Sequence, residues 1–441
     1  MEGLMSWVHV HAIPVSAIIL LVAYFFIATE KIPKVTVALI GAAVTLLLGL
    51  LGQDKLVNGV FDHGYFINFV DFNVIFLLVS MMIIGSIATK SGMFNWVANE
   101  MLKLTKGNPK LILISLAFFT AIVSAFLDNV TTVILIMPVT FVIAKELDIN
   151  PLPFLITEIL SSNIGGTATL IGDPPNIIIG SAAGLSFMAF IKELTFIVLA
   201  ILAVNVALLT FIFRKQLVAA KEKMEKIAAL DNSNTITDKA LMIRSGLVLL
   251  FVITGFVLHD ITHIQTCVTA MAGAAFLLLF EKPHHIFNEV EWNTIFFFIG
   301  LFIIIGGLEH AGGIKLMSEW LLNVTNGSQK ATAMIILWAS GILSGIIDNI
   351  PYTATMSPLL VEVQNVMGKD YTYPLWWCLS LGACLGGNMT IIGAAANVIV
   401  SETAASVGHP IKFMHFLKYG VLITAISLVM STVYIWFRFL G

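Results

Sequence analysis

The sequence predicts an all-α polytopic membrane protein built from two inverted repeats, and three observations predict it. The chain of 441 residues is 58% hydrophobic and only 11% charged, which is more apolar surface than a soluble domain hides. Two segments about 220 residues apart carry the same polar residues inside apolar runs. Basic residues also divide unequally between the two sides of the predicted membrane.

The repeat is clearest around two Asp-Asn pairs. Residues 124–140 read SAFLDNVTTVILIMPVT and residues 344–360 read SGIIDNIPYTATMSPLL, so Asp128 matches Asp348 and Asn129 matches Asn349. Further on, SSNIGGTATLIGDPPNIIIG (161–180) aligns with GACLGGNMTIIGAAANVIVS (382–401), with 7 of 20 positions identical. Carboxylates, amides and glycines repeated inside apolar segments are typical of transporters with two repeats.

The apolar runs define the expected crossings, because a spanning helix needs about 20 apolar residues. Uninterrupted runs are expected to cross near 13–29, 35–52, 72–90, 186–213, 241–258, 265–280, 293–309 and 413–437. Residues 152–182 and 374–403 are also long enough, but Gly, Asn and Pro interrupt them. We interpret these two as broken helices, one in each repeat.

Residues 111–144 and 331–361 carry the Asp-Asn pairs in their middle. Each region is too short for two crossings of about 20 residues and a turn. Each is therefore predicted to be a re-entrant hairpin whose tip lies at membrane depth and lines a cavity. Five crossings and one hairpin in each repeat make the repeats inverted. The expected divisions are repeat one (1–213), a cytoplasmic linker (214–240) and repeat two (241–441).

Positive charge supports this topology. With the loop 214–244 in the cytoplasm, 17 of the 23 Lys and Arg residues lie on the cytoplasmic side, and the other 6 lie outside. The 17 include Lys31 and Lys34, between the first two runs. The bias predicts a multi-pass protein of the cell inner (plasma) membrane with its N-terminus outside. A net charge of −3 gives no reason to expect nucleic-acid binding, and no GxxxxGK[ST] motif points to ATP.

The two hairpin tips are the first candidate site. A carboxylate at the bilayer centre costs at least ~2.5–3.5 kcal/mol, so Asp128 and Asp348 are predicted to function in proton coupling and ion binding. The alternative is that each caps a helix at its tip. Asn129, Asn349, Thr131 and Thr132 add oxygen atoms that suit a hard cation such as sodium. The alternative for the two asparagines is that they satisfy the hairpin backbone.

The two broken helices are the second candidate site, because their freed carbonyls and helix ends can hold ions. The alternative is a kink needed only for packing. The predicted binding residues are Asn163, Gly165, Gly166, Thr167, Asp173, Asn176, Gly387, Asn388, Thr390 and Asn397. Glu158 and Asp173 occur only in repeat one; each is a proton-coupling candidate, or else a packed acid and a helix cap. No Lys or Arg lies in either tip or either break, which favours a cation or neutral solute over an anion.

The segments FLDNVTTVILIMPVT, NIGGTATLIGDPPNIII and LGACLGGNMTIIGAAANVIV resemble those of the ion-transporter superfamily. The resemblance is to its ArsB/NhaD branch, and within it to the melanosomal P protein and its bacterial relatives. It covers about residues 30–435. It implies a homodimer with a scaffold part and a moving transport part, and it implies that the tips and breaks hold substrate and coupling ions.

We therefore expect a secondary active ion transporter, with sodium/proton antiport by alternating access as the first hypothesis. The alternatives are an efflux carrier for arsenite or another small anion or oxyacid on the same fold, and, from another class, a passive ion channel. No cofactor is expected beyond sodium or a proton as coupling ion. An enzyme is not expected, because no nucleophile and base pair is evident near the predicted midplane.

Overall fold

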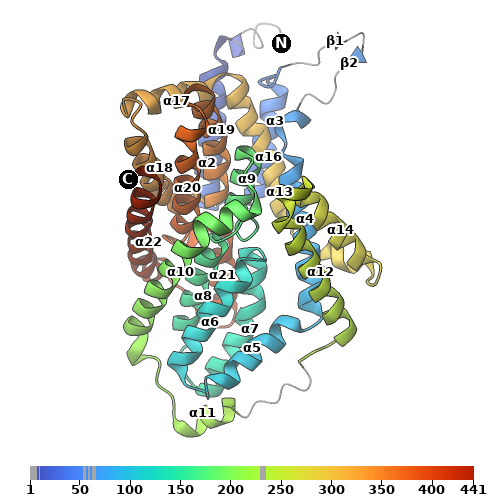
Figure 1. Ribbon diagram of the computed structural model, residues 1–441, viewed down its shortest axis with the longest axis vertical. Helices are drawn as coiled ribbons and strands as arrows, with labels where there is room; N and C mark the ends of the chain where they lie inside the picture. Colours follow the sequence, from blue (N-terminus) through green and yellow to red (C-terminus); the bar gives the residue numbers. More distant parts are fainter. Residues whose placement is uncertain (1–6, 9, 53–55, 58–59, 62–65, 229–234) are drawn as a thin grey trace.

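The computed structural model describes residues 7–8, 10–52, 56–57, 60–61, 66–228 and 235–441, and it is almost entirely helical (Figure 1). Eight helices of this described part are long and apolar enough to cross a membrane. The prediction of an all-α polytopic membrane protein is therefore confirmed, and the inverted arrangement of the repeats stays a prediction. A short hairpin of β1 (Leu56–Val57) and β2 (Val60–Phe61) is the one strand pair in the described residues.

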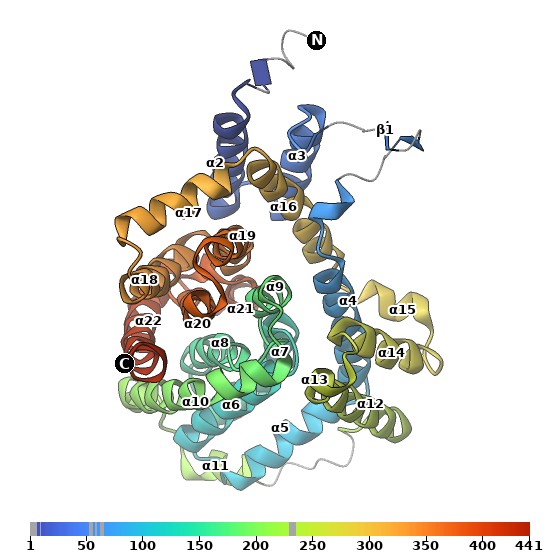
Figure 2. The same ribbon diagram turned by 45° about the horizontal axis from the view of Figure 1, so that its top comes forward.

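Six helices form one layer, which we call the wall. They are α2 (Ala12–Thr29), α3 (Lys34–Leu47), α4 (Phe72–Lys90), α12 (Lys239–Val257), α14 (Thr266–Leu278) and α16 (Trp292–His310). α3 and α2 pack against α16, whereas α14 and α12 pack against α4. Each half of the chain therefore contributes helices to both ends of the wall, which is an arc in Figure 2. At 14 and 13 residues, α3 and α14 are shorter than the expected runs 35–52 and 265–280.

Ten other helices of the described residues form a second layer, which we call the bundle. From the first half they are α6 (Pro109–Ser124), α7 (Asn129–Leu147), α8 (Leu152–Gly166), α9 (Pro174–Ala183) and α10 (Phe187–Ile212). From the second half they are α18 (Gln329–Ile347), α19 (Asn349–Met367), α20 (Lys369–Gly386), α21 (Ala395–Ser406) and α22 (Phe413–Ile435). α6 packs along α8 as α18 packs along α20. Bundle and wall lie side by side in Figure 2.

Short helices join these layers and complete the chain. α5 (Met93–Leu104) leads from α4 to α6, and α17 (Gly313–Val324) leads from α16 to α18. Both are preceded by a glycine with positive φ, Gly92 at 83° and Gly312 at 87°, which allows the sharp turn out of the wall. The other short elements are η1 (Ile67–Phe69), η2 (Phe213–Lys215), α11 (Lys221–Ala228), α13 (His259–Thr262), α15 (Pro283–Asn288), η3 (Ile391–Gly393) and η4 (Trp436–Leu440).

Two close helix contacts recur in the two halves, because glycines let the backbones approach. A Cβ atom at Gly165 on α8 would lie 2.2 Å from the carbonyl oxygen of Ala121 on α6. A Cβ atom at Gly386 on α20 would lie 2.5 Å from the carbonyl oxygen of Gly341 on α18. These positions match at offsets of 220 and 221 residues. The broken helices thus lie against the first limb of each hairpin.

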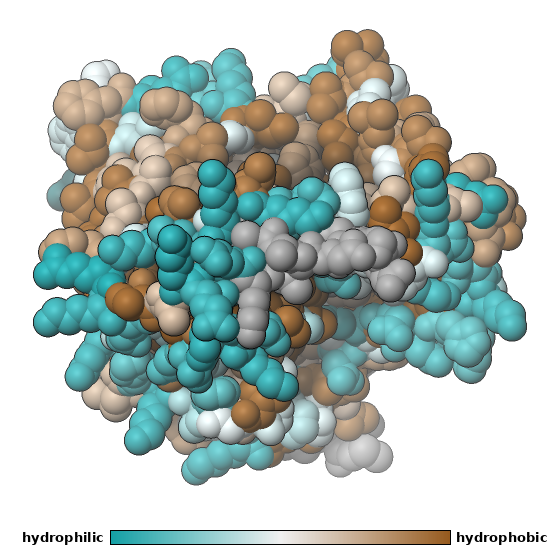
Figure 3. Space-filling model, turned by 90° about the horizontal axis from the view of Figure 1, so that it is seen from below, coloured by the Kyte–Doolittle hydropathy of each residue, from teal (hydrophilic) through white to brown (hydrophobic). Residues whose placement is uncertain are grey.

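The face that carries α11 is rich in hydrophilic side chains (Figure 3). α11 packs against α5 and α7, and Lys223 on α11 pairs with Asp148 at the end of α7 at 2.7 Å. Exposed Lys106, Lys145 and Lys221 lie on these same elements or beside them. We call this surface the linker face. Its positive charges support the prediction that it faces the cytoplasm.

Candidate functional site

The first hairpin tip is the turn between α6 and α7. Asp128 is the N-cap of α7, and its carboxylate accepts hydrogen bonds from the backbone N–H of Thr131 at 2.9 Å and from the Thr131 hydroxyl at 2.5 Å. The helix-cap interpretation of Asp128 therefore holds in the structure. It leaves the charge of this partly buried carboxylate without a basic partner among the described residues.

The second tip, between α18 and α19, has different surroundings. Asp348 is 1% exposed, and its backbone φ of 120° lies in a region that residues other than glycine rarely adopt. Its carboxylate accepts from the N–H of Ile350 at 3.0 Å and forms an ion pair of 2.5 Å with Lys34, at the start of α3. A strained residue held in this way is common at functional sites. Of the two equivalent aspartates, Asp348 therefore forms an ion pair, whereas Asp128 has no basic partner among the described residues.

Asp173 lies in the first break, before α9. It has the N-cap position of α9, but its carboxylate accepts no backbone N–H there. Both of its oxygens instead accept from the side-chain amide of Asn349, at 3.3 Å each. Asp173 is 1% exposed. The bond joins the first break to the tip of the second hairpin, so residues 176 positions apart meet.

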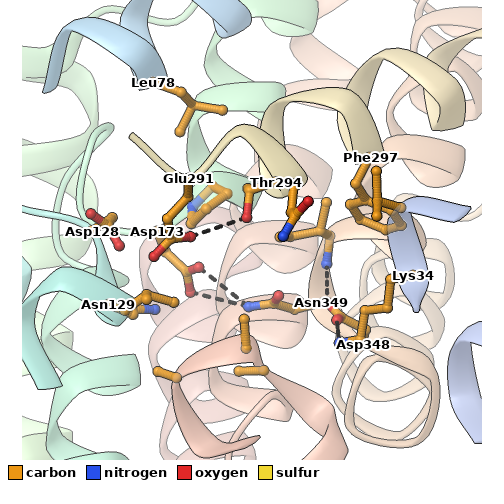
Figure 4. A pocket seen from close by; sticks show the side chains of 18 of the residues that line it. Lys34, Leu78, Asp128, Asn129, Asp173, Glu291, Thr294, Phe297, Asp348 and Asn349 are labelled. Carbon is orange, nitrogen blue, oxygen red and sulfur yellow. Dashed lines mark hydrogen bonds and ion pairs between the residues drawn. The ribbon is translucent and has the colours of Figure 1, made fainter. Parts of the chain in front are cut away.

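These groups line a cavity of about 250 Å³ between the wall and the bundle, which we call the central cavity (Figure 4). The bundle contributes Asp128, Asn129, Asp173, Asp348 and Asn349. The wall contributes Lys34 from α3, Leu78 and Met82 from α4, and Glu291, Asn293, Thr294 and Phe297 at the start of α16. Glu291 accepts a hydrogen bond from the Thr294 hydroxyl at 3.1 Å. Four carboxylates therefore line the cavity with one ammonium group.

The charges of the central cavity favour cations and protons. Lys34 is already paired with Asp348 and lies 3.7 Å from Glu30, so its charge is largely compensated. The other three carboxylates have no basic partner among the described residues, and a bound proton or cation would offset their negative charge. Within the described residues, no three His, Cys, Asp or Glu side chains are grouped to hold one metal ion. A sodium ion here would take amide, hydroxyl or carbonyl oxygens alongside a carboxylate.

A buried network of side-chain amides lies behind the central cavity. Asn129 donates to Asn163 at 3.3 Å, and Asn163 donates to the side chains of Asn388 and Asn397 at 2.9 Å each. Asn388 donates to the carbonyl of Leu160 at 3.3 Å. The network crosses between the two halves of the chain. Of its four amides, Asn129 also lines the central cavity.

The breaks are closed by their own asparagines. Asn176 donates to the carbonyls of Thr167 and Thr169 at 3.1 and 2.9 Å, and Asn397 donates to those of Gly387 and Thr390 at 2.8 and 2.9 Å. The freed carbonyls, expected to bind ions, thus have protein donors. Ion binding by these carbonyls stays a prediction.

Several predicted site residues have packing roles in the structure. A Cβ atom at Gly165 would collide with backbone atoms, and one at Gly166 would collide with Asn129 and with backbone atoms. The Thr390 hydroxyl donates to the carbonyl of Gly345 at 2.6 Å. The Thr167 hydroxyl donates to the carbonyl of Asn163 at 2.8 Å. Glu158, buried between α8 and α7, accepts from Thr140 and does not line the central cavity. Thr132 is fully buried, with its hydroxyl unpaired among the described residues.

Sequence reasoning missed Lys34 and Glu291. The charge distribution predicts Lys34 on the cytoplasmic side, but the structure places it in the central cavity. No local pattern links it to Asp348, which is 314 residues away. Glu291 had a signal, because an acid precedes the matching asparagines Asn73 and Asn293 by two residues in both repeats, as Asp71 and Glu291.

Comparison with known proteins identifies the family of the chain. Residues 24–382 match the profile of CitMHS, described as a citrate transporter family. The chain is 41% identical over 428 residues to an uncharacterized transporter of Mycobacterium tuberculosis, covering 96% of this chain and 98% of that protein. It is 30% identical to the mouse P protein over 493 residues, covering 93% of this chain but 58% of that longer protein.

A solved structure shares the fold. The YdaH transporter of Alcanivorax borkumensis, described as having an unusual topology, superposes with a TM-score of 0.57 at 13% identity, covering 96% of this chain and 98% of that one. The resemblance to the P protein is confirmed, whereas the ArsB/NhaD placement stays a prediction. The chain is a multi-pass membrane transporter of small solutes, not an enzyme. Because the profile covers most of its length, the chain belongs to the CitMHS citrate transporter family.

Proposed function

We propose that this transporter exchanges sodium for protons across the plasma membrane by alternating access. The observation that carries the proposal is the pair Asp128 and Asp173, two carboxylates of the central cavity without a basic partner among the described residues. Asp128 keeps its capping bonds and Asp173 receives one amide group, so both retain lone pairs for a cation. Protons and sodium would compete for them.

The position of the cavity supports alternating access. Wall residues and bundle residues line it in roughly equal part, so movement of the bundle along the wall would carry Asp128 and Asp173 away from Glu291. The ion pair between Lys34 and Asp348 crosses the same boundary and would have to separate. A two-layer arrangement of this kind supplies the two states that coupling needs.

The test is ion flux in liposomes that contain purified protein and an internal pH dye. Sodium, lithium, potassium, arsenite, succinate and citrate are added outside in turn. External sodium is expected to cause proton release from acid-loaded liposomes, and an outward proton gradient larger than the sodium gradient is expected to move sodium inward against the sodium gradient. Asp128→Asn and Asp173→Asn are expected to abolish this flux, and the surface variant Asp148→Asn to keep it. Sodium-independent pH changes, or full activity of both variants, contradict the proposal.

A second candidate is a carrier of a small anion or oxyacid. The family match and the presence of Lys34 in the cavity favour it. An excess of carboxylates over ammonium groups in the same cavity opposes it. The two candidates separate in the same assay, because citrate, succinate or arsenite would then drive the pH change in the absence of sodium. A passive channel would dissipate either gradient without moving any ion uphill.

A further inference from the structure

A second cavity, of about 340 Å³, opens near the linker face, and we call it the vestibule. Lys90 of α4, His285 of α15 and the following Glu289 are among its lining residues. The backbone carbonyl of Lys90 accepts a hydrogen bond from Thr237 in the linker at 2.5 Å. The vestibule therefore lies on the side predicted to be cytoplasmic.

The vestibule meets the central cavity at two residues, since Met82 and Glu291 line both cavities. Thr131 adds a polar link between them. Its side chain lines the vestibule, and its hydroxyl donates to Asp128, which lines the central cavity. The Glu291 carboxylate and the Thr131 hydroxyl thus lie between the vestibule and Asp128.

The other repeat offers an internal comparison. Asp71 matches Glu291 at an offset of 220 residues, and it lines a distal cavity of about 190 Å³ with Phe302, Glu309 and Ala354. These three match Met82, Thr89 and Ile134 of the vestibule. The two cavities are therefore equivalent in sequence and lie at opposite ends of α4. In the described part of the chain, the distal cavity shares no lining residue with the central cavity.

The carboxylates of the matching residues Asp71 and Glu291 accept different hydrogen bonds. Asp71 caps α4, accepting from the backbone N–H groups of Asn73 at 3.0 Å and Val74 at 3.3 Å. Glu291 stands at the N-cap of α16 but accepts no backbone N–H, and its carboxylate bonds to Thr294 instead. The Glu291 side chain lies in the central cavity with its carboxylate bonded to Thr294 (Figure 4). Glu291 also lines the vestibule. Glu291 is therefore not needed as a cap.

Other charged groups line the two cavities that Glu291 borders. Asp128, Asp173, Asp348 and Lys34 face it from the central cavity, with Lys34 paired to Asp348. Lys90, His285 and Glu289 face the vestibule, and Lys90 is paired to Glu281. No basic side chain forms an ion pair with Glu291 among the residues described.

We infer that Glu291 is the residue that passes protons between the vestibule and the central cavity, an inference that rests on the proposed proton coupling. A proton from vestibule water binds the Glu291 carboxylate and moves on to Asp128 or Asp173 as the cation leaves. The reverse path returns it. Glu291 acts as a relay and sodium does not bind it.

The experiment compares Glu291→Gln, Glu291→Asp and the matched control Asp71→Asn in liposomes. Glu291→Gln is expected to slow proton-coupled flux by about tenfold or more and to remove its dependence on the pH of the linker-face side. Sodium affinity measured by calorimetry at fixed pH should change by less than about threefold. Glu291→Asp should restore part of the rate. Asp71→Asn should keep the rate within about twofold, since an amide also caps a helix.

Two results would overturn the inference. One is a Glu291→Gln variant with the wild-type rate and pH profile, which would show that Glu291 is not a relay. The other is a Glu291→Gln variant that loses sodium binding together with flux, which would make Glu291 an ion ligand. Size-exclusion and thermal unfolding of each variant separate these from misfolding, and Glu291→Asp gives a second folded test. Wild-type protein without any proton-coupled flux overturns the proposed function itself, and with it the relay.

Discussion

At the scale of single residues, the two equivalent aspartates differ most. Asp128 caps α7 and has no basic partner among the described residues, whereas Asp348 is fixed by Lys34. Both positions followed from the repeated Asp-Asn motif. The difference between them did not, because Lys34 reaches Asp348 from a helix of the other layer. Local patterns identify candidate residues, but they do not show which charges meet across the fold.

The Lys34–Asp348 pair gives a prediction about energetic coupling. Removing either partner leaves a charge in a mostly enclosed site, so Lys34→Met and Asp348→Asn should each lower thermal stability. The double variant should recover part of the loss, with a coupling energy of about 0.5–3 kcal/mol. Thermal unfolding in detergent measures all four proteins. Strictly additive losses would show that the pair contributes nothing to the folded state.

At the scale of elements, the positions of the paired helices and of the breaks follow largely from the sequence, whereas the re-entrant course of the pairs stays a prediction. The limbs α6, α7, α18 and α19 occupy 109–147 and 329–367, slightly beyond the expected 111–144 and 331–361. The helices break at 167–173 and 387–394, at or directly after the Gly-Gly positions 165–166 and 386–387, and Pro174 begins the next helix in the first repeat. The amide network and the closing of the breaks by Asn176 and Asn397 could not be predicted, because each bond depends on tertiary contacts.

The close approach of α8 to α6 gives a second prediction. Gly165→Ala would place a Cβ atom 2.4 Å from the Cα atom of Ala121, so the helices must separate. We expect a loss of stability of about 1–3 kcal/mol, with reduced transport because the tip at Asp128 moves. Gly246→Ala on α12 is the control, since its Cβ atom would meet nothing within 4 Å. Equal unfolding temperatures for the two variants would contradict this account of the packing.

The attachment of α11 gives a prediction about pH. The Lys223 ammonium, 2.7 Å away, lowers the pKa of the exposed Asp148 carboxyl from its ordinary value. A lowered pKa in the folded state means that the pair stabilises the docked linker above the unfolded pKa of about 3.9. That contribution is lost as the pH falls through the folded pKa.

Hydrogen exchange of the α11 amides measures this effect. Exchange in the wild-type protein should accelerate below about pH 4 relative to the intrinsic rate, and Asp148→Asn should show the faster exchange already at neutral pH. The change should be small because the pair is exposed. Protection of α11 that is the same in both proteins at neutral pH would show that other contacts hold the linker.

At the scale of the whole molecule, the two layers were not evident from the sequence. The wall takes α2 and α3 from the first half to cover α16, and α12 and α14 from the second half to cover α4. Hydropathy finds the helices but not this exchange of partners between the halves. The central cavity follows from it, since it lies where the wall meets both hairpin tips.

The topology gives a prediction about labelling. If both hairpins re-enter the membrane, Lys106 and Lys145 at the two ends of the first one lie on the same side. Lys106→Cys and Lys145→Cys should then react with a membrane-impermeant maleimide from the same face, the cytoplasmic one. The three native cysteines are buried and should give little background. Labelling from opposite faces would mean that residues 111–144 cross the membrane.

The central claim is that a cation and a proton compete for the carboxylates of the central cavity. Calorimetric titration of sodium into the purified protein over a series of pH values tests it most directly. The account predicts that sodium affinity falls as the pH drops, by up to about tenfold per pH unit where one proton is displaced, and that Asp128→Asn removes this dependence. Sodium binding that does not change with pH, or no sodium binding at all, would contradict it.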